Sequence, residues 1–388
     1  MRLVFVVDGL PHARAGTERQ LSILLAHLAQ RAQVDVVVLR PSPWLFDNAT
    51  RLGLGAHLVS FNGLKSPAGW LGLVRLWRCL RRLKPDVVHT FLPVANIFGV
   101  LAAQLCGVRT ILASRRDFGE WMTPAYLRAT RLANRCVDHI VVNAPRVGQL
   151  THEAEGFPPG KISVIYNGMD VAAFQSLSRD ATLLSELRLP AGAKLAILVA
   201  NFRPMKRHAT AVRAARLLKD AGENLHIVFI GANAMPYDLR EQTRALATEL
   251  DVADVVHFVP DTSNVPAWLA LADIGINCSQ GEGLSNAVME YMAASLPVIV
   301  AASGGNPDLI EHERTGLLFP LDDAQALAAG LRRLAGDPAL GRRLAAAALD
   351  HARAHFDIQK MSAQFFDLYC RLSSSAQRGA LRAPSLPR

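Results

Sequence analysis

Short and almost entirely apolar runs recur along this chain, and stretches with helical periodicity lie between many of them. The first series comprises residues 3–7, 34–38, 86–90, 110–114, 139–143 and 162–166, and the second comprises 195–200, 226–231, 255–259, 273–277 and 297–301. Strands without polar positions must be covered on both faces, as in a parallel sheet between two helical layers. The two series therefore predict an α/β chain with two doubly wound, Rossmann-like domains.

The boundary between the two domains is predicted from the interval that lacks any strand pattern. At 388 residues the chain exceeds an average single domain, and residues 168–192 contain no strand signal. We predict an N-terminal domain over 1–172 and a C-terminal domain over 173–355, with a final amphipathic helix over 356–372 that rejoins the first domain. The tail, 373–388, is poor in bulky apolar residues and is predicted to be disordered.

Hydropathy and cysteine usage indicate the compartment. No run approaches the roughly 18 apolar residues of a membrane-spanning helix, and the start "MRLVFVVDGL" is typical of a core strand rather than a signal peptide. The five cysteines are scattered and form no C-x-x-C pair. This pattern favours a reducing, cytoplasmic environment and argues against structural zinc or a disulfide framework.

The positive charge of the chain is concentrated in its first half. Residues 1–190 carry 22 Lys or Arg and 13 Asp or Glu, a net charge of +9, whereas residues 191–372 carry 17 and 20, a net charge of −3. Such an excess predicts an anionic partner for the first half, which could be nucleic acid, a membrane surface or a phosphorylated substrate.

Two groups of arginines at helical spacing help to choose among these anionic partners. The two groups are Arg75, Arg78, Arg81 and Arg82 near Trp77, and Arg128, Arg131 and Arg135 after Trp121. Cations next to apolar side chains favour an anionic lipid surface, although a solvated helix face has the same pattern. No nucleic-acid recognition module is visible, so we expect no nucleic-acid partner.

The stretch 281–290, "GEGLSNAVME", places two glutamates around the start of a predicted helix. It follows the strand at 273–277, and doubly wound sheets bind ligands at the carboxyl ends of their strands. Free N–H groups at a helix start bind anions, so Glu282, Glu290 and these amides suit a nucleotide-sugar, with phosphate between two hydroxylated ends. The spacing alone also fits an ordinary acidic capping turn followed by an exposed helix acid.

Four segments together resemble the retaining glycosyltransferases of family 4, which have the GT-B fold. "EGLSNAVME" with "PVIVAASGGNPDLIEHERTGLLF" is similar to the E-x7-E region, and "VANFRPMKRH" resembles the phosphate-binding loop of the second domain. "DGLPHARAGTERQL" resembles the N-terminal glycine loop, and "VIYNGMD" the interdomain turn. The resemblance covers residues 1–370 and implies two domains facing across a cleft, which transfer a sugar with retention by front-face displacement.

The resemblance also implies roles for individual residues. Glu290 is similar to the acid that binds the ribose hydroxyls, and Glu282 to the acid that holds the donor sugar. Lys206 is similar to the lysine that contacts the diphosphate. Gly16 would allow its backbone to approach the donor phosphate. The backbone amides implied to face the diphosphate are those of Gly283, Leu284, Ser285 and Asn286.

The chain departs from the family pattern at two positions. Asn201 stands where the family has an arginine, five residues before Lys206, and Arg203 is the candidate that would supply this charge instead. Arg116 stands where several members have a histidine beside the reacting sugar. Arginine stays protonated, so it can bind phosphate or hydroxyls but cannot act as a general base. His89, at the end of the preceding strand, is the alternative, although its position also suits a core histidine.

No Asp-x-Asp motif occurs in the chain. We therefore predict no metal and no other cofactor, and expect amides, a helix start, Lys206 and Arg203 to stabilise the leaving diphosphate. The predicted catalytic residues are Glu282, Lys206, Arg203 and Arg116.

The predicted reaction is transfer from a UDP-, GDP- or ADP-sugar to a lipid-linked acceptor or a polysaccharide or lipopolysaccharide precursor. The enzyme would work in the cytoplasm, at the inner face of the membrane. Three alternatives stay open: a nucleotide-sugar epimerase or a phosphorylase of the same fold, and a non-catalytic basic membrane-binding protein with a degenerate cleft.

Overall fold

The computed structural model describes residues 1–12, 16–61, 63, 67–119, 122–177, 180, 182–185, 187, 189–233, 238–259, 262 and 264–382. The chain divides into two compact units, Met1–Gly168 together with Ile358–Arg388, and Met169–Asp357. The division lies a few residues before the boundary that the sequence predicts between 172 and 173. Each unit is described here by itself.

The first unit is built on a parallel sheet with the strand order β3-β2-β1-β4-β5-β6-β7. Its strands are β1 (Arg2–Val7), β2 (Gln33–Val38), β3 (Leu54–Leu58), β4 (Val87–Phe91), β5 (Thr110–Arg115), β6 (His139–Val142) and β7 (Ile162–Val164). Chain order reverses between the neighbours β1 and β4, and this reversal is the point where ligands bind in doubly wound sheets.

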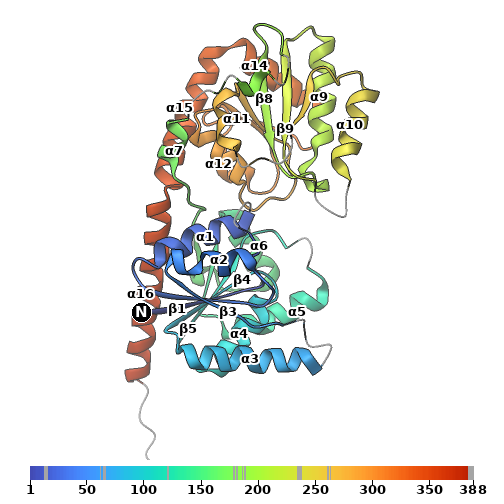
Figure 1. Cartoon of the computed structure of the whole chain (residues 1–388). Helices are drawn as coiled ribbons and strands as arrows, with labels where there is room; N and C mark the ends of the chain where they lie inside the picture. Colours follow the sequence, from blue (N-terminus) through green and yellow to red (C-terminus); the bar gives the residue numbers. More distant parts are fainter. Residues whose placement is uncertain are drawn as a thin grey trace, which may run out of the picture. The chain divides into compact units, whose positions relative to one another are not determined.

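Helices cover both faces of this sheet, with α1 and α2 on one side and α3 and α4 on the other (Figure 1). They are α1 (Gly16–Leu28), α2 (Pro43–Leu52), α3 (Pro67–Leu83), η1 (Ala95–Gly99), α4 (Val100–Leu105), α5 (Pro124–Ala133), η2 (Asn134–Cys136), α6 (Pro145–Glu155), η3 (Pro159–Lys161) and α16 (Ile358–Arg382). The core on the first face joins apolar side chains of α1, α2 and α16 to the strands, because Leu24, Phe365 and Tyr369 pack with Phe5 in one buried cluster.

The C-terminal helix α16 is longer than the sequence predicts. It continues to Arg382, ten residues beyond the predicted end at 372. The predicted disordered tail is therefore wrong for residues 373–382, and residues 383–388 lie outside the described part of the chain.

The second unit repeats the same topology, with the strand order β10-β9-β8-β11-β12-β13. Its strands are β8 (Lys194–Val199), β9 (Leu225–Ile230), β10 (Val256–Val259), β11 (Ile274–Asn277), β12 (Val298–Ala301) and β13 (Leu317–Phe319). The helices are α7 (Val171–Gln175), α8 (Thr182–Ser185), η4 (Pro204–Lys206), α9 (His208–Asp220), α10 (Leu239–Glu249), α11 (Val265–Leu271), α12 (Asn286–Ala293), α13 (Asn306–Leu309), α14 (Ala324–Gly336) and α15 (Pro338–His355). Here the order reverses between β8 and β11.

The predicted α/β class and the two parallel sheets are confirmed, but two strands were missed. β3, "LGAHL", lacks an apolar run because its glycine makes room for a neighbour. A Cβ at Gly55 would lie 2.0 Å from Oδ1 of Asp35, and this carboxylate bonds to His57 at 2.8 Å. β13 spans only three residues, too few for a period to be visible.

Among the described residues, no helix is both long enough and apolar enough to cross a bilayer.

Candidate active site

The loops that follow β8 and β11 meet at the switch point of the second sheet. Lys206 ends η4 after β8, and Glu282 lies in the loop between β11 and α12. The backbone N–H of Gln280 donates to the carbonyl of Met205 over 2.7 Å, which ties the two loops together. Parallel strands that are neighbours at a switch point leave their carboxyl-end loops adjacent, so the topology brings these two predicted site residues together.

The Lys206 ammonium and the Glu282 carboxylate form an ion pair. Their side chains are 19% and 13% exposed, so both charged groups are mostly buried but a ligand can still contact them. Burial alone raises the pKa of Glu282. The charge of Lys206 and hydrogen bonds from Lys206, Ser279 and Ser285 outweigh burial, and the pKa lies below its usual value. Glu282 is therefore ionised at neutral pH, and an ionised carboxylate can accept hydrogen bonds at both oxygens.

The start of α12 lies directly after this loop. Ser285 is the N-cap residue, but its side chain makes no hydrogen bond to the first turn. The positive end of the helix is therefore not capped by its own hydroxyl, which leaves the first turn suited to an anion. Gly283, Leu284 and Ser285 are buried and Asn286 is partly exposed. The predicted contact of their backbone amides with the diphosphate stays a prediction.

Glu290 is the fifth residue of α12 and is 6% exposed. The helix is held on the sheet by the next residue, because the Tyr291 hydroxyl accepts a hydrogen bond from the backbone N–H of Val199 over 2.7 Å. A Cβ at Gly275 on β11 would lie 2.5 Å from the Tyr291 ring, so the glycine lets the ring approach. Glu290 thus comes from an immobilised turn of helix.

The loop that carries Glu282 rests on the segment after β12. The backbone N–H of Gly305 donates to the carbonyl of Glu282 over 2.8 Å. A Cβ at Gly305 would lie 2.0 Å from the carbonyl oxygen of Gly283, so no other residue type fits here. Asn277, at the end of β11, and Asn306, at the start of α13, are buried beneath the loop. Neither residue was predicted from the sequence to have a role, although Asn277, a polar residue that ends an apolar strand, was a visible signal.

Asn201 and Arg203 have different environments. The Oδ1 atom of Asn201 accepts a hydrogen bond from the N–H of Ala232 over 3.2 Å, which joins the loops after β8 and β9. The Asn201 side chain therefore makes a structural hydrogen bond and carries no charge, unlike the arginine that the family has at this position. Arg203 is exposed, and no ion pair holds its guanidinium within the described part of the chain. Its predicted contact with the diphosphate stays a prediction.

Gly16 is the first residue of α1, after the switch-point strand β1 of the first unit. Its φ is +59°, in the left-handed region that favours glycine. Residues 13–15 of the predicted glycine loop lie outside the described residues. Gly16 is exposed, and the predicted close approach of a donor phosphate to this turn stays a prediction.

Arg116 follows β5 and is partly buried. Its guanidinium donates a hydrogen bond to Oδ1 of Asn167, and lies 6.0 Å from the centre of the Phe91 ring. Burial lowers the pKa of Arg116 to about 10, so the side chain stays charged at neutral pH. Arg116 is thus oriented by the asparagine of the "YNG" turn, and it remains a candidate for binding phosphate or hydroxyl groups.

His89 lies in the core beside Arg116. Its Nδ1 atom is 2.8 Å from the Tyr369 hydroxyl, and its Nε2 atom is 2.9 Å from Oγ of Ser114. The side chain is 1% exposed. Burial first, and then the charges of Arg116 and His139, hold the pKa of His89 well below its usual range. Both ring nitrogens have protein partners, which favours the structural interpretation of this histidine.

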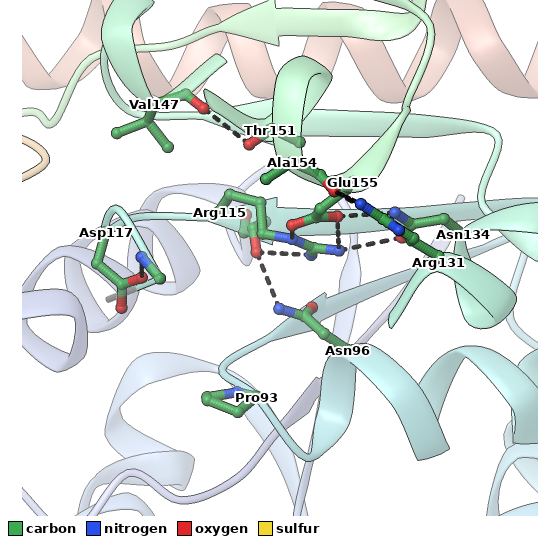
Figure 2. A network of polar contacts seen from close by, with 12 residues as sticks. Pro93, Asn96, Arg115, Asp117, Arg131, Asn134, Val147, Thr151, Ala154 and Glu155 are labelled. Atoms are coloured by element: carbon green, nitrogen blue, oxygen red, sulfur yellow. Dashed lines mark hydrogen bonds and ion pairs between the residues drawn. The ribbon is translucent and has the colours of Figure 1, made fainter. Parts of the chain in front are cut away.

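A buried charge pair supports the end of β5 next to Arg116 (Figure 2). The Nε and Nη2 atoms of Arg115 donate to the two carboxylate oxygens of Glu155 over 2.7 and 2.9 Å. Asn134 accepts from the same guanidinium over 3.0 Å and donates to Glu155 over 2.7 Å. The network joins β5, η2 and α6, and so fixes the strand end from which Arg116 projects.

Within the described ranges, no group of three or more His, Cys, Asp or Glu side chains could hold a metal ion.

Comparison with known proteins identifies the family. The profile described as "Glycosyltransferase Family 4" matches residues 14–173, and the profile "Glycosyl transferases group 1" matches residues 181–351. A D-inositol 3-phosphate glycosyltransferase of Thermomonospora curvata is 31% identical over 359 residues, which are 87% of this chain and 80% of that protein. The chain is a family 4 glycosyltransferase with the GT-B fold. A second relative of the same name, from Streptomyces scabiei, is 27% identical over 73% of this glycosyltransferase and 67% of its own length.

A solved structure shows the same fold. The crystal structure of Anabaena Alr3699/HepE in complex with UDP has a TM-score of 0.85 and 18% identity, and the match covers 96% of this glycosyltransferase and all of that chain. Family membership supports a glycosyltransferase over the non-catalytic basic protein that the sequence had left open.

Proposed function

We propose that this glycosyltransferase moves a sugar from a UDP-, GDP- or ADP-sugar to an acceptor hydroxyl with retention of configuration. One observation carries the proposal: Lys206 and Glu282 are paired at the switch point of the second sheet, beside the start of α12. The ammonium and the helix start would hold the diphosphate, and the Glu282 carboxylate would accept hydrogen bonds from the sugar. Glu290 would bind the ribose hydroxyls.

The proposed reaction is a front-face displacement. The bond between the anomeric carbon and the phosphate oxygen breaks, the acceptor oxygen bonds to the same face of that carbon, and the leaving phosphate takes the acceptor's proton. The charge that develops on the phosphate would be stabilised by Lys206, by Arg203 and by backbone amides, without a metal ion. No carboxylate is assigned as a nucleophile, and Glu282 is already engaged by Lys206.

The comparisons support the donor more strongly than the acceptor. Crystal structures of Alr3699/HepE contain UDP and UDP-glucose, which makes UDP-sugars the first donors to test here. The names of the relatives specify transfer to D-inositol 3-phosphate. We propose a lipid-linked acceptor, or a polysaccharide or lipopolysaccharide precursor of the cell envelope. A small phosphorylated acceptor is the alternative that Arg116 and the positive first half would also accommodate.

One helix face favours the lipid-linked acceptor. Trp70 and Leu71 at the start of α3 are each 57% exposed, and Val74 is 40% exposed. The exposed arginines of the same helix are Arg75, Arg78, Arg81 and Arg82. Apolar side chains followed by cations suit the edge of an anionic membrane, whereas pairing with a second copy of this face would oppose like charges.

This α3 face supports a cytoplasmic enzyme bound peripherally to the inner face of the membrane. Trp121, which precedes the other predicted basic helix face, lies outside the described residues.

Thermal-shift screening against UDP, GDP and ADP sugars tests the proposed donor, because a ligand that binds the folded state raises the melting temperature. The donor found in this way is then offered to candidate acceptors, with and without EDTA, and the product's anomeric configuration is read by NMR. We expect a retained linkage and turnover that survives chelation. Conversion of the donor into another nucleotide-sugar, or phosphate-dependent release of a sugar phosphate, would instead indicate an epimerase or a phosphorylase.

A further inference from the structure

A buried chain of side-chain hydrogen bonds runs beneath the loop that carries Glu282. The Nδ2 atom of Asn306 donates to Oδ1 of Asn277 over 3.2 Å, and Nδ2 of Asn277 donates to Oγ of Ser285 over 3.1 Å. Ser285 is among the groups whose hydrogen bonding holds the pKa of the Glu282 carboxylate below its usual value. Asn277 is 3% exposed and Ser285 and Asn306 are each 1% exposed, so bulk water does not compete for these groups.

The backbone fixes the direction in which this chain donates. The carbonyl of Ala301 accepts from Nδ2 of Asn306 over 2.9 Å, so the amide nitrogen of Asn306 must point this way. The N–H of Ser279 donates to Oδ1 of Asn277 over 3.0 Å, so this oxygen must be an acceptor. Nδ2 of Asn277 is then left to donate to Ser285, and the Ser285 hydroxyl proton is left for Glu282. Every donor therefore points toward the carboxylate.

The orientation of Asn306 in this chain of hydrogen bonds carries an energetic penalty. Its Oδ1 atom is buried and has no hydrogen-bond partner among the described residues. A buried acceptor without a partner is destabilising, and a side chain without this oxygen would avoid the penalty. The amide nitrogen is the part of Asn306 that the structure uses.

We propose that Asn306 and Asn277 are positioning residues that act through Ser285 to hold Glu282 ionised and aimed at the donor sugar. The proposal rests on the role proposed above for Glu282. Its physical basis is that a hydrogen bond to a carboxylate favours the charged form, and that bonds aligned in a buried chain reinforce one another. Lys206 approaches the carboxylate from the loop after β8, and the chain of hydrogen bonds supports the carboxylate from the side of β11 and β12.

The test replaces the donor in Asn306 without changing its size. Asn306→Asp puts an acceptor where Nδ2 now donates, which favours a turned Asn277 amide that gives up the hydrogen bond from the N–H of Ser279. The Ser285 hydroxyl then turns to Asn277, and Glu282 loses one hydrogen bond. Because a hydrogen bond to a charged group is worth about tenfold in an equilibrium constant, we expect kcat to fall roughly tenfold. The acid limb of the kcat–pH profile should move up by about one pH unit, since Glu282 is then protonated at a higher pH.

Two further variants separate charge from geometry. Asn306→Leu removes the donor without adding a charge and should shift the acid limb in the same direction. Ser285→Ala removes the last link, and its effect should not add to that of Asn306→Asp, because both break one path. Affinity for the free nucleoside diphosphate should stay within about twofold in the Asn306 variants, since Glu282 is assigned to the sugar.

Val212→Ala is the stability control, because Val212 is fully buried in α9 and takes no part in the chain. An unshifted acid limb in both Asn306 variants would overturn the proposal. The proposal would also be overturned if kcat, nucleotide affinity and melting temperature all fell together, because a general loss of that kind indicates a merely structural role. Glu282→Ala distinguishes failure of the proposed function from failure of this inference. If the variant leaves kcat and the acid limb unchanged, the donor role of Glu282 fails, and the positioning role of Asn306 and Asn277 fails with it.

Discussion

The ammonium of Lys206 is ion-paired with the carboxylate of Glu282, although 76 residues separate them in the sequence. The pair joins the loops after β8 and β11, the two neighbouring strands at which the order of the second sheet reverses. In the free enzyme each charge satisfies the other. A bound nucleotide-sugar would offer the diphosphate to Lys206 and hydroxyl groups to Glu282, so the same two side chains can exchange one partner for another.

Lys206→Met should destabilise the second unit by about 1–3 kcal/mol near neutral pH, because it leaves a largely buried carboxylate without its cation. The lowered pKa of Glu282 means that the pair stabilises the fold above the unfolded-state pKa, and that this contribution is lost as pH falls through the folded-state value. The difference from wild type, measured by urea denaturation, should therefore shrink when the pH is lowered from neutral to below the usual pKa of a glutamate carboxyl.

Glu282→Gln provides the matched control for this prediction. Added to Lys206→Met, it removes the unpaired charge and should recover most of the stability at neutral pH. A deficit of the same size at both pH values, or no recovery in the double variant, would mean that the ion pair does not set the energetics of this loop.

The Arg115–Glu155 pair should be important for the stability of the first unit. The two side chains are 6% and 3% exposed, so Glu155→Gln leaves a buried guanidinium without its counter-charge and should cost about 3–5 kcal/mol in urea unfolding. Replacing both residues by methionine removes both charges and should be much less costly. A Glu155→Gln variant within about 0.5 kcal/mol of wild type would contradict this.

The exposed face of α3 should bind anionic vesicles. We expect wild-type protein to sediment with them at low salt and to be released at high salt, since each basic residue near such a surface is worth about 1 kcal/mol. Changing Arg75, Arg78, Arg81 and Arg82 to glutamine should abolish most binding, and changing Trp70 and Leu71 to serine should weaken what remains at high salt.

The control for the α3 face changes four exposed arginines of the second unit to glutamine, namely Arg213, Arg332, Arg342 and Arg353. This variant has the same net charge as the α3 variant and should still bind. Equal losses in both would indicate a response to overall charge, and no binding by the wild type would make a soluble acceptor the better proposal.

Much of the fold was predictable because the buried strands can be recognised from their apolar composition. Buried strands such as β1 and β9 are apolar at nearly every position, and each could be located to within a residue or two. β3 could not be found, because its glycine is required by the side chain of Asp35 on the neighbouring strand. This requirement exists only once the strands are paired.

The candidate site was predictable in its members but not in its contacts. The motif and the resemblance pointed to Glu282 and Lys206 separately, and their pairing depends on how two loops are tied at the switch point. Asn277 and Asn306 could not be predicted as partners, because nothing in the chain relates two asparagines on different elements until β11 and β12 lie side by side.

Isothermal titration of UDP, GDP and ADP into wild type, Glu290→Ala and Glu282→Ala tests the central claim, that the second unit binds a nucleotide-sugar through two acids with separate tasks. We predict that one of the three nucleotides binds at one site per chain. Glu290→Ala should weaken this binding about tenfold, through lost bonds to the ribose, and Glu282→Ala should leave it within about twofold while lowering kcat. Failure of all three nucleotides to bind, or equal loss of affinity in both variants, would contradict the account.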